Sequence, residues 1–142
     1  WARLAVGFVF AATGWGKLHN LDTVGEFFAN LGLPAPTFMA ALVATTEFVG
    51  GSLLIVGLAS RLAALPLAVT MTVALATAKR SEIEGLSSLF GQIEFLYLTI
   101  FVWIAVAGPG AIALDRLVVY LAKKRWFPTA ATSQENVAIG GT

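Results

Sequence analysis

The chain has 142 residues, of which 58% are hydrophobic and only 12% charged, and its formal net charge is +1. Soluble globular proteins carry about 25% charged residues, so this composition argues against a soluble fold and indicates an integral membrane protein. The small net charge gives no reason to expect nucleic acid as a partner. The sequence contains no cysteine and one histidine, His19, which excludes disulfides, thiolate metal or iron–sulfur sites and bis-histidine haem ligation within the chain.

The first predicted membrane span covers residues 2–18. A helix needs about 20 mostly apolar residues to cross a bilayer, with a workable range of about 17–25. Arg3 is followed by a long apolar run, which is typical of a first span and not of a cleavable leader. Gly7, Phe10 and Gly14 share one face of this helix, and we expect that face to pack closely against another helix.

A short amphipathic helix is predicted at residues 23–31. The spacing of Thr23 and Glu26 is typical of a capping box, which would begin the helix at Thr23. An apolar stripe follows at helical spacing, which favours a helix on the membrane surface over a lid above a substrate. The stripe consists of Val24, Phe27, Phe28 and Leu31.

Three further spans are predicted at residues 37–58, 62–78 and 89–107. Pro66 is expected in the first turn of the third span, where its missing N–H costs little. Beyond the fourth span, residues 112–127 predict a second interfacial helix, and residues 128–142 a disordered tail. The chain is therefore predicted to be all-α, with one four-helix membrane domain at residues 1–127. Two small-residue faces are expected to pack this bundle: Ala40, Ala44 and Gly51 in the second span, and Ala64, Ala68, Thr72 and Ala76 in the third.

The distribution of basic residues predicts the orientation, because cytoplasmic loops carry an excess of Lys and Arg. With the N-terminus inside, six basic residues lie on the inner side and three on the outer side. We therefore expect a multi-pass protein of the bacterial cytoplasmic membrane with both termini in the cytoplasm. The inner residues are Arg3, Arg61, Arg116, Lys123, Lys124 and Arg125, and the outer ones are Lys17, Lys79 and Arg80.

A polar cluster is predicted in the outer half of the bundle. An ionisable side chain in the bilayer centre costs roughly 2.5–3.5 kcal/mol, so Glu47 in the second span requires a physical reason. It shares the packing face of that span and should point into the bundle. Two interpretations stay open. The favoured one is a structural ion pair that fixes helix register, most simply of Glu47 or Glu94 with Lys17. The other is a site that binds or deprotonates a small polar group such as a quinone headgroup. The cluster consists of Lys17, Glu47, Glu94, Lys79 and Tyr97.

Several short motifs in a fixed order resemble the DoxX family of small bacterial four-helix membrane proteins. They are Gly14-Trp15-Gly16-Lys17-Leu18, Phe27-Phe28 leading to Leu31-Gly32-Leu33-Pro34, Glu47 before Gly50-Gly51, Leu54 and Gly57, Arg61, and Gly108-Pro109-Gly110 before Leu114-Asp115. The resemblance implies a membrane subunit that is associated with oxidoreductases, in one branch with thiosulfate:quinone oxidoreductase. Lys17, Glu47 and Gly51 occupy family-typical positions, whose role stays open.

Three functions follow as expectations. The first is an accessory or anchoring subunit of a quinone-linked oxidoreductase complex, with the bilayer, a larger redox protein or further copies of the chain as partners and a quinone or lipid as ligand. The second is a small oligomeric transporter that uses Glu47 and Glu94 as a relay. The third, an enzyme in its own right, ranks lowest, because the sequence shows no nucleophile–base pair, metal cluster or phosphate-binding loop.

Overall fold

The computed structural model describes residues 1–83 and 85–108. Within these residues the protein has six α-helices, one 3-10 helix and no β-strand, as the composition predicts. The predicted interfacial helix at 112–127 and the tail at 128–142 lie outside the described residues. The elements in chain order are α1 (Ala2–Leu18), α2 (Leu21–Asn30), α3 (Pro36–Val56), α4 (Ser60–Ala76), η1 (Arg80–Glu82), α5 (Leu86–Gly91) and α6 (Ile93–Ala107).

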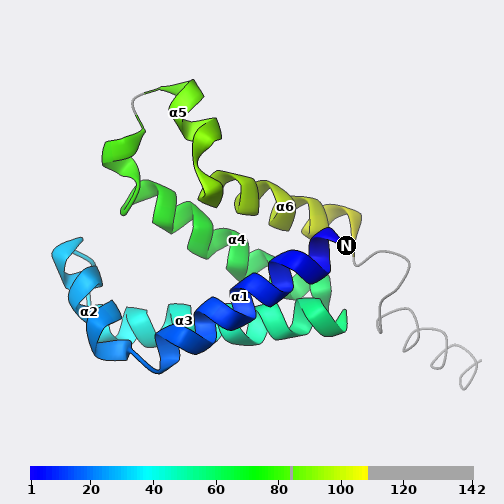
Figure 1. Cartoon of the computed structure of the whole chain (residues 1–142), viewed down its shortest axis with the longest axis horizontal. Helices are drawn as coiled ribbons and strands as arrows, with labels where there is room; N and C mark the ends of the chain where they lie inside the picture. Colours follow the sequence, from blue (N-terminus) through cyan, green and yellow to red (C-terminus); the bar gives the residue numbers. More distant parts are fainter. Residues whose placement is uncertain (84, 109–142) are drawn as a thin grey trace, which may run out of the picture.

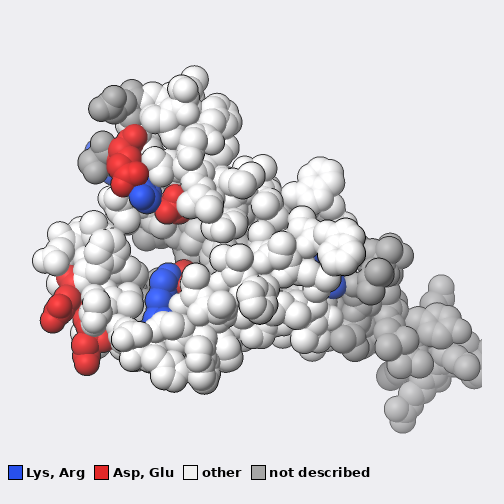
Figure 2. All heavy atoms as spheres, in the orientation of Figure 1, with Lys and Arg blue, Asp and Glu red and all other residues white. Residues whose placement is uncertain are grey.

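The four longest helices pack in two pairs (Figure 1). Helix α1 lies along α3, and α4 lies along α6, while the contact between α3 and α4 joins the two pairs. Helix α2 packs on the first part of α3, and η1 and α5 lie at the same end of the molecule as α2. Figure 2 shows that most charged side chains on this face gather at that end, whereas the rest of the described surface is largely uncharged.

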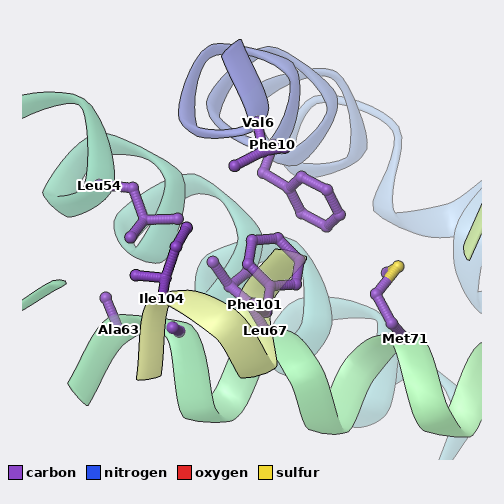
Figure 3. Packing of buried hydrophobic residues seen from close by; sticks show 9 residues of the cluster. Val6, Phe10, Leu54, Ala63, Leu67, Met71, Phe101 and Ile104 are labelled. Carbon is purple, nitrogen blue, oxygen red and sulfur yellow. The ribbon is translucent and has the colours of Figure 1, made fainter. Parts of the chain in front are cut away.

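The apolar core lies where α1, α3, α4 and α6 meet (Figure 3). Phe10 of α1 makes edge-to-face contact with Phe101 of α6, with the ring centroids 4.8 Å apart. Such aromatic pairs add to the free energy of burial, and here they tie the two helix pairs together. The buried side chains are Val6, Phe10, Leu54, Ala63, Ala64, Leu67, Met71, Phe101 and Ile104.

Glycines allow the backbones of α1 and α3 to approach closely, as the sequence predicts for the faces that carry Gly14 and Gly51. A Cβ atom on Gly14 would overlap the backbone of Phe48 and lie 2.9 Å from the carbonyl oxygen of Ala44. A Cβ atom on Gly51 would lie 2.7 Å from the carbonyl oxygen of Gly7. Helices in lipid associate largely through such close packing, so this contact fixes the α1–α3 pair.

The predicted small-residue face of the third span is only partly confirmed. Ala64 is fully buried, but Thr72 and Ala76 are exposed. The buried line of α4 instead continues through Leu67, Met71 and Leu75, which fill the wider space between α4 and its neighbours. On this helix, large side chains and not small ones make most of the interior contact.

Two predictions about helix starts were wrong. Helix α2 begins at Leu21 with Asn20 at its N-cap and no side-chain cap, so the predicted capping box of Thr23 and Glu26 lies inside the helix. Helix α4 begins at Ser60, two residues before the predicted span, which places Pro66 in the helix interior. Proline has no N–H to donate to the carbonyl of Leu62, so the regular hydrogen bonding of α4 is interrupted there.

The predicted fourth span at residues 89–107 is broken in two. Gln92 has an extended backbone (φ −76°, ψ 131°), which separates α5 from α6. Gly91 precedes it, and glycine favours helix less than other residues apart from proline. The end of this span was predicted correctly, because α6 stops at Ala107 and Gly108 has a positive φ of 90°.

Of the helices described, only α3 is both long enough and apolar enough to cross a bilayer by length and composition. Helices α4 and α6 are apolar but shorter, with 17 and 15 residues. The all-α prediction is therefore confirmed, whereas the number of membrane crossings stays a prediction.

Candidate functional site

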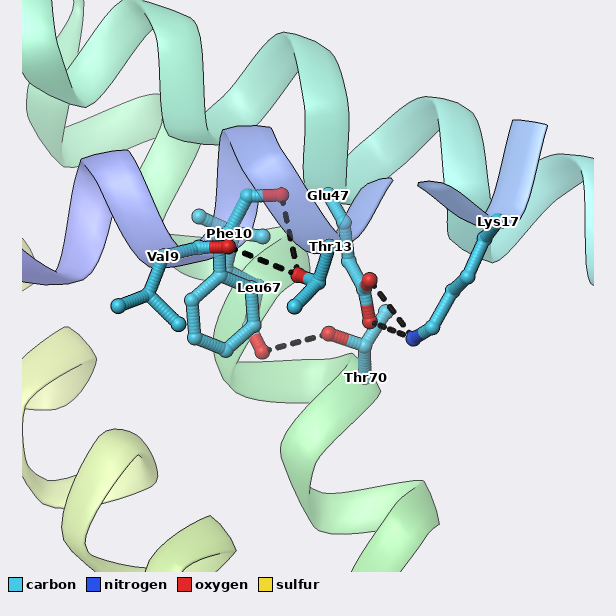
Figure 4. Close-up of polar contacts among 7 residues, drawn as sticks. All are labelled: Val9, Phe10, Thr13, Lys17, Glu47, Leu67 and Thr70. Atoms are coloured by element: carbon cyan, nitrogen blue, oxygen red, sulfur yellow. Dashed lines mark hydrogen bonds and ion pairs between the residues drawn. The ribbon is translucent and has the colours of Figure 1, made fainter. Parts of the chain in front are cut away.

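A buried ion pair joins α1 to α3. The Nζ atom of Lys17, in the last turn of α1, lies 2.6 Å from Oε1 and 2.7 Å from Oε2 of Glu47, so it donates to both carboxylate oxygens (Figure 4). Glu47 is only 2% exposed, whereas the Lys17 side chain keeps 35% of its surface exposed. The sequence predicted that Glu47 points into the bundle, and the structure confirms it.

The register of the two helices produces this pair. Gly14 of α1 lies against Ala44 and Phe48 of α3, and Lys17 and Glu47 each lie within one turn of that contact. The close backbone approach therefore brings the ammonium within reach of the carboxylate. A buried carboxylate without a partner would be costly, so the pair accounts for an acid in the middle of an apolar helix.

A cavity of about 980 Å³ opens beside the ion pair. Figure 2 shows it as a hollow at the charged end of the molecule, with a basic side chain at its edge. Helices α2, α3 and α4 form most of its wall, Lys17 and Glu47 lie on one side, and Glu94 at the start of α6 completes it. Its wall is largely apolar and includes Val24, Phe27, Phe28, Leu31, Leu42, Val43, Val69, Met71 and Val73.

The apolar stripe of α2 faces this cavity. Val24, Phe27, Phe28 and Leu31, which were predicted to lie on the membrane surface, all line it. Helix α2 packs against the start of α3 at Gly25, where a Cβ atom would lie 3.6 Å from the Thr37 Cα atom, an ordinary van der Waals distance. The helical spacing of the stripe was visible in the sequence, but the surface against which it would lie was not.

Glu94 differs from Glu47 in its surroundings. Its Oε2 atom is buried and makes no hydrogen bond with any residue that the structure describes. The carboxylate lies in the first turn of α6, where the N-terminal end of the helix dipole favours a negative charge. Of the five residues predicted to form a polar cluster, the structure brings Lys17, Glu47 and Glu94 to one cavity.

The other two predicted residues lie elsewhere. Tyr97 packs against the apolar core, with its ring edge-to-face with Phe10 at 5.2 Å, and it does not line the cavity. Lys79 lies beyond the end of α4, where its Nζ donates to Oε1 of Glu82 at 3.0 Å. The hydrogen bond that Lys79 donates to Glu82 raises the pKa of Lys79, and the same contact lowers the pKa of Glu82.

The Lys79–Glu82 pair predicts a small pH effect on stability. Because the folded state lowers the pKa of Glu82 below its ordinary value of 4.5, the contribution of Glu82 is present at neutral pH and is lost as the pH falls below that value. The pair is solvent-exposed, so we expect Glu82→Gln to change the unfolding temperature at pH 7 only slightly. Thermal unfolding between pH 3 and pH 7 measures this, and a large difference at pH 7 would contradict it.

Comparison with known proteins identifies the family. The family model described as DoxX matches residues 1–80, which include the Lys17–Glu47 pair and the glycines beneath it. This chain belongs to the DoxX family. The resemblance drawn from the sequence motifs is thereby confirmed.

Curated relatives of this DoxX protein are membrane proteins or carry an oxidoreductase name. "Putative oxidoreductase CatD" of Bacillus subtilis is 32% identical over 82% of this chain and 83% of its own length. Inner membrane protein YqjF of Escherichia coli is 30% identical over 88% of this chain and 92% of its own length. "Uncharacterized membrane protein Rv3486" of Mycobacterium tuberculosis is 33% identical over 80% of this chain. No solved structure matches the chain.

Proposed function

We propose that this DoxX protein is a quinone-binding accessory subunit of an oxidoreductase system in the bacterial cytoplasmic membrane. The observation that carries this proposal is the apolar cavity with the Lys17–Glu47 pair in its wall. Ligand sites are typically concave and apolar, with a few polar groups that orient the ligand. A quinone has an apolar ring and tail and two carbonyl oxygens, so the wall fits its tail and the Lys17 ammonium can donate to one oxygen.

The membrane arrangement that we propose has four crossings, made by α1, α3, α4 and α6 together with the segments that extend them. At 1.5 Å per residue, α1 with its 17 residues is about 26 Å long, close to the roughly 30 Å of a bilayer core. Many large apolar side chains on the outside, such as Phe8, Leu62, Leu65 and Trp103, suit contact with lipid. With both termini in the cytoplasm, the cavity lies on the outer side of the membrane.

A role as a subunit rests on a different argument. The chain has no cysteine and a single histidine, so it has no ligands for an iron–sulfur cluster or a bis-histidine haem, and we infer that a quinone bound here exchanges electrons with another protein. The name of the relative CatD agrees with an oxidoreductase system. We expect a redox protein to co-purify with this chain after gentle extraction from the native membrane. Recovery of only the monomer or a homo-oligomer would contradict the accessory role.

Quinone binding is tested with purified protein in nanodiscs, titrated with a decyl-substituted benzoquinone. Ala74 of α4 lines the cavity, so Ala74→Phe should fill it, whereas Ala76 is exposed on the same helix and Ala76→Phe is the matched control. We expect the wild type and Ala76→Phe to bind, and Ala74→Phe to lose at least about tenfold in affinity, or about 1.4 kcal/mol. Absence of binding by the wild type, or equal binding by both variants, would contradict the proposal.

The alternative of a transporter with a carboxylate relay is less well supported. Glu47 is held by two short contacts to Lys17 and is almost fully buried, which does not suit a group that must exchange protons with both sides. A relay predicts substrate flux in proteoliposomes that is abolished by Glu94→Gln. Flux that survives this change would exclude the relay.

A further inference from the structure

The cavity wall contains one carboxylate that forms no ion pair with any residue that the structure describes. Among residues 1–83 and 85–108, the charged side chains that line the cavity are Lys17, Glu47 and Glu94. Lys17 and Glu47 form an ion pair with each other. Lys79 lies near enough to interact electrostatically with Glu94, but its hydrogen bonds go to Glu82. Within the described part of the chain, Glu94 is therefore the acidic group of the wall that is left for a ligand.

The hydrogen-bonding capacity of Glu94 is also incompletely used. Its buried Oε2 atom accepts no hydrogen bond from a described residue, and a buried acceptor without a donor destabilises the fold. Glu94 lines the cavity, so a donor supplied by a ligand there would satisfy this oxygen once the carboxylate turns it toward the cavity. Hydrogen bonds to a charged carboxylate are among the stronger ones in proteins, so the chemistry of that donor should influence which ligand binds.

We propose that Glu94 accepts a hydrogen bond from a hydroxyl group of the bound ring, so that the cavity binds a quinol more tightly than the corresponding quinone. This inference rests on the proposed quinone site and names the redox form that the site prefers. A quinol carries two hydroxyl donors, whereas a quinone presents only acceptor oxygens, which a carboxylate repels. Glu94 is thus a specificity-determining residue, and binding requires no transfer of electrons by this chain.

A lipophilic cation is the other class of ligand that a carboxylate can attract. The quinol is favoured here because the same ring can use both polar groups of the wall: one hydroxyl donates to Glu94, and the other hydroxyl oxygen accepts from Lys17. A quaternary ammonium has neither a donor for Glu94 nor an acceptor for Lys17. The experiment therefore includes such a cation as a competitor.

The experiment compares the affinities of decyl-substituted benzoquinol and benzoquinone, measured anaerobically by calorimetry on protein in nanodiscs. We expect the wild type to prefer the quinol about tenfold, which corresponds to a rise of about 30 mV in the midpoint potential of the bound two-electron couple. Glu94→Gln should abolish the preference, because the glutamine amide can donate to a quinone carbonyl. Glu26→Gln is the matched control, since it removes an exposed carboxylate of α2 that does not line the cavity.

The outcomes separate this inference from the proposed function. If the wild type binds neither form, the quinone site itself is wrong. If it binds both forms equally, or if Glu94→Gln keeps the preference, the role of Glu94 is overturned while the quinone site stands. Tighter binding of dodecyltrimethylammonium than of the quinol would also overturn the inference. Unfolding temperatures of the variants, measured in parallel, show that Glu94→Gln remains folded.

Discussion

Replacing Lys17 with methionine is expected to destabilise the protein by about 3–5 kcal/mol, because the change leaves Glu47 as a buried carboxylate without its partner. Glu47 is 2% exposed and both of its oxygens accept from Lys17, so removal of the ammonium leaves two buried acceptors without their donor. We expect the Lys17→Met variant to unfold at a clearly lower temperature in mild detergent, or to accumulate poorly in the membrane.

The double variant Lys17→Met/Glu47→Met shows whether the loss comes from the unpaired charge. Replacing both partners of a buried ion pair with apolar residues of similar size is often neutral or stabilising. The double variant should therefore recover most of the stability that Lys17→Met alone loses. Single and double variants that are equally unstable would show that the two residues contribute independently, and the ion-pair interpretation would then fail. Retention of quinone binding by the stable double variant would show that Lys17 does not orient the ligand.

Replacing Gly14 with alanine is expected to separate α1 from α3. The added methyl group would overlap the backbone of Phe48, which cannot move aside as a flexible side chain could. Overpacking of this kind costs about 1–3 kcal/mol. Because Lys17 lies one turn beyond Gly14, a displaced α1 should also weaken the ion pair. We therefore expect a loss of folding stability at the upper end of that range.

Gly16→Ala provides the control for Gly14→Ala. Both glycines belong to α1, but a Cβ atom on Gly16 would meet nothing within 4 Å. Alanine favours helix over glycine by about 1 kcal/mol, so this variant should be as stable as the wild type or slightly more stable. Thermal unfolding in mild detergent measures the difference in stability between the two variants. Equal unfolding temperatures would mean that the α1–α3 contact is looser than the structure shows.

Helix α2 shows what helical spacing in the sequence can and cannot predict. The spacing of Val24, Phe27 and Phe28 was enough to predict a helix with one apolar face. It could not show that this face lines a cavity, because that depends on how α2 packs against the start of α3. The same limit explains the misplaced capping box, since local spacing does not reveal that the helix begins two residues earlier, at Leu21.

The sequence by itself determined the all-helical class, the membrane environment, the family and the inward direction of Glu47. The class, the environment and the direction of Glu47 follow from composition, apolar run length and helical spacing, which act within one segment of chain. The family follows from the resemblance of the short motifs and their order. Only the tertiary structure decided that Lys17 is the partner of Glu47, that Glu94 shares their cavity, and that Lys79 and Tyr97 do not. Which side chains become partners depends on the register between the helices. Close backbone contacts set this register, such as that of Gly14 with Phe48. The periodicity of either helix alone does not reveal it.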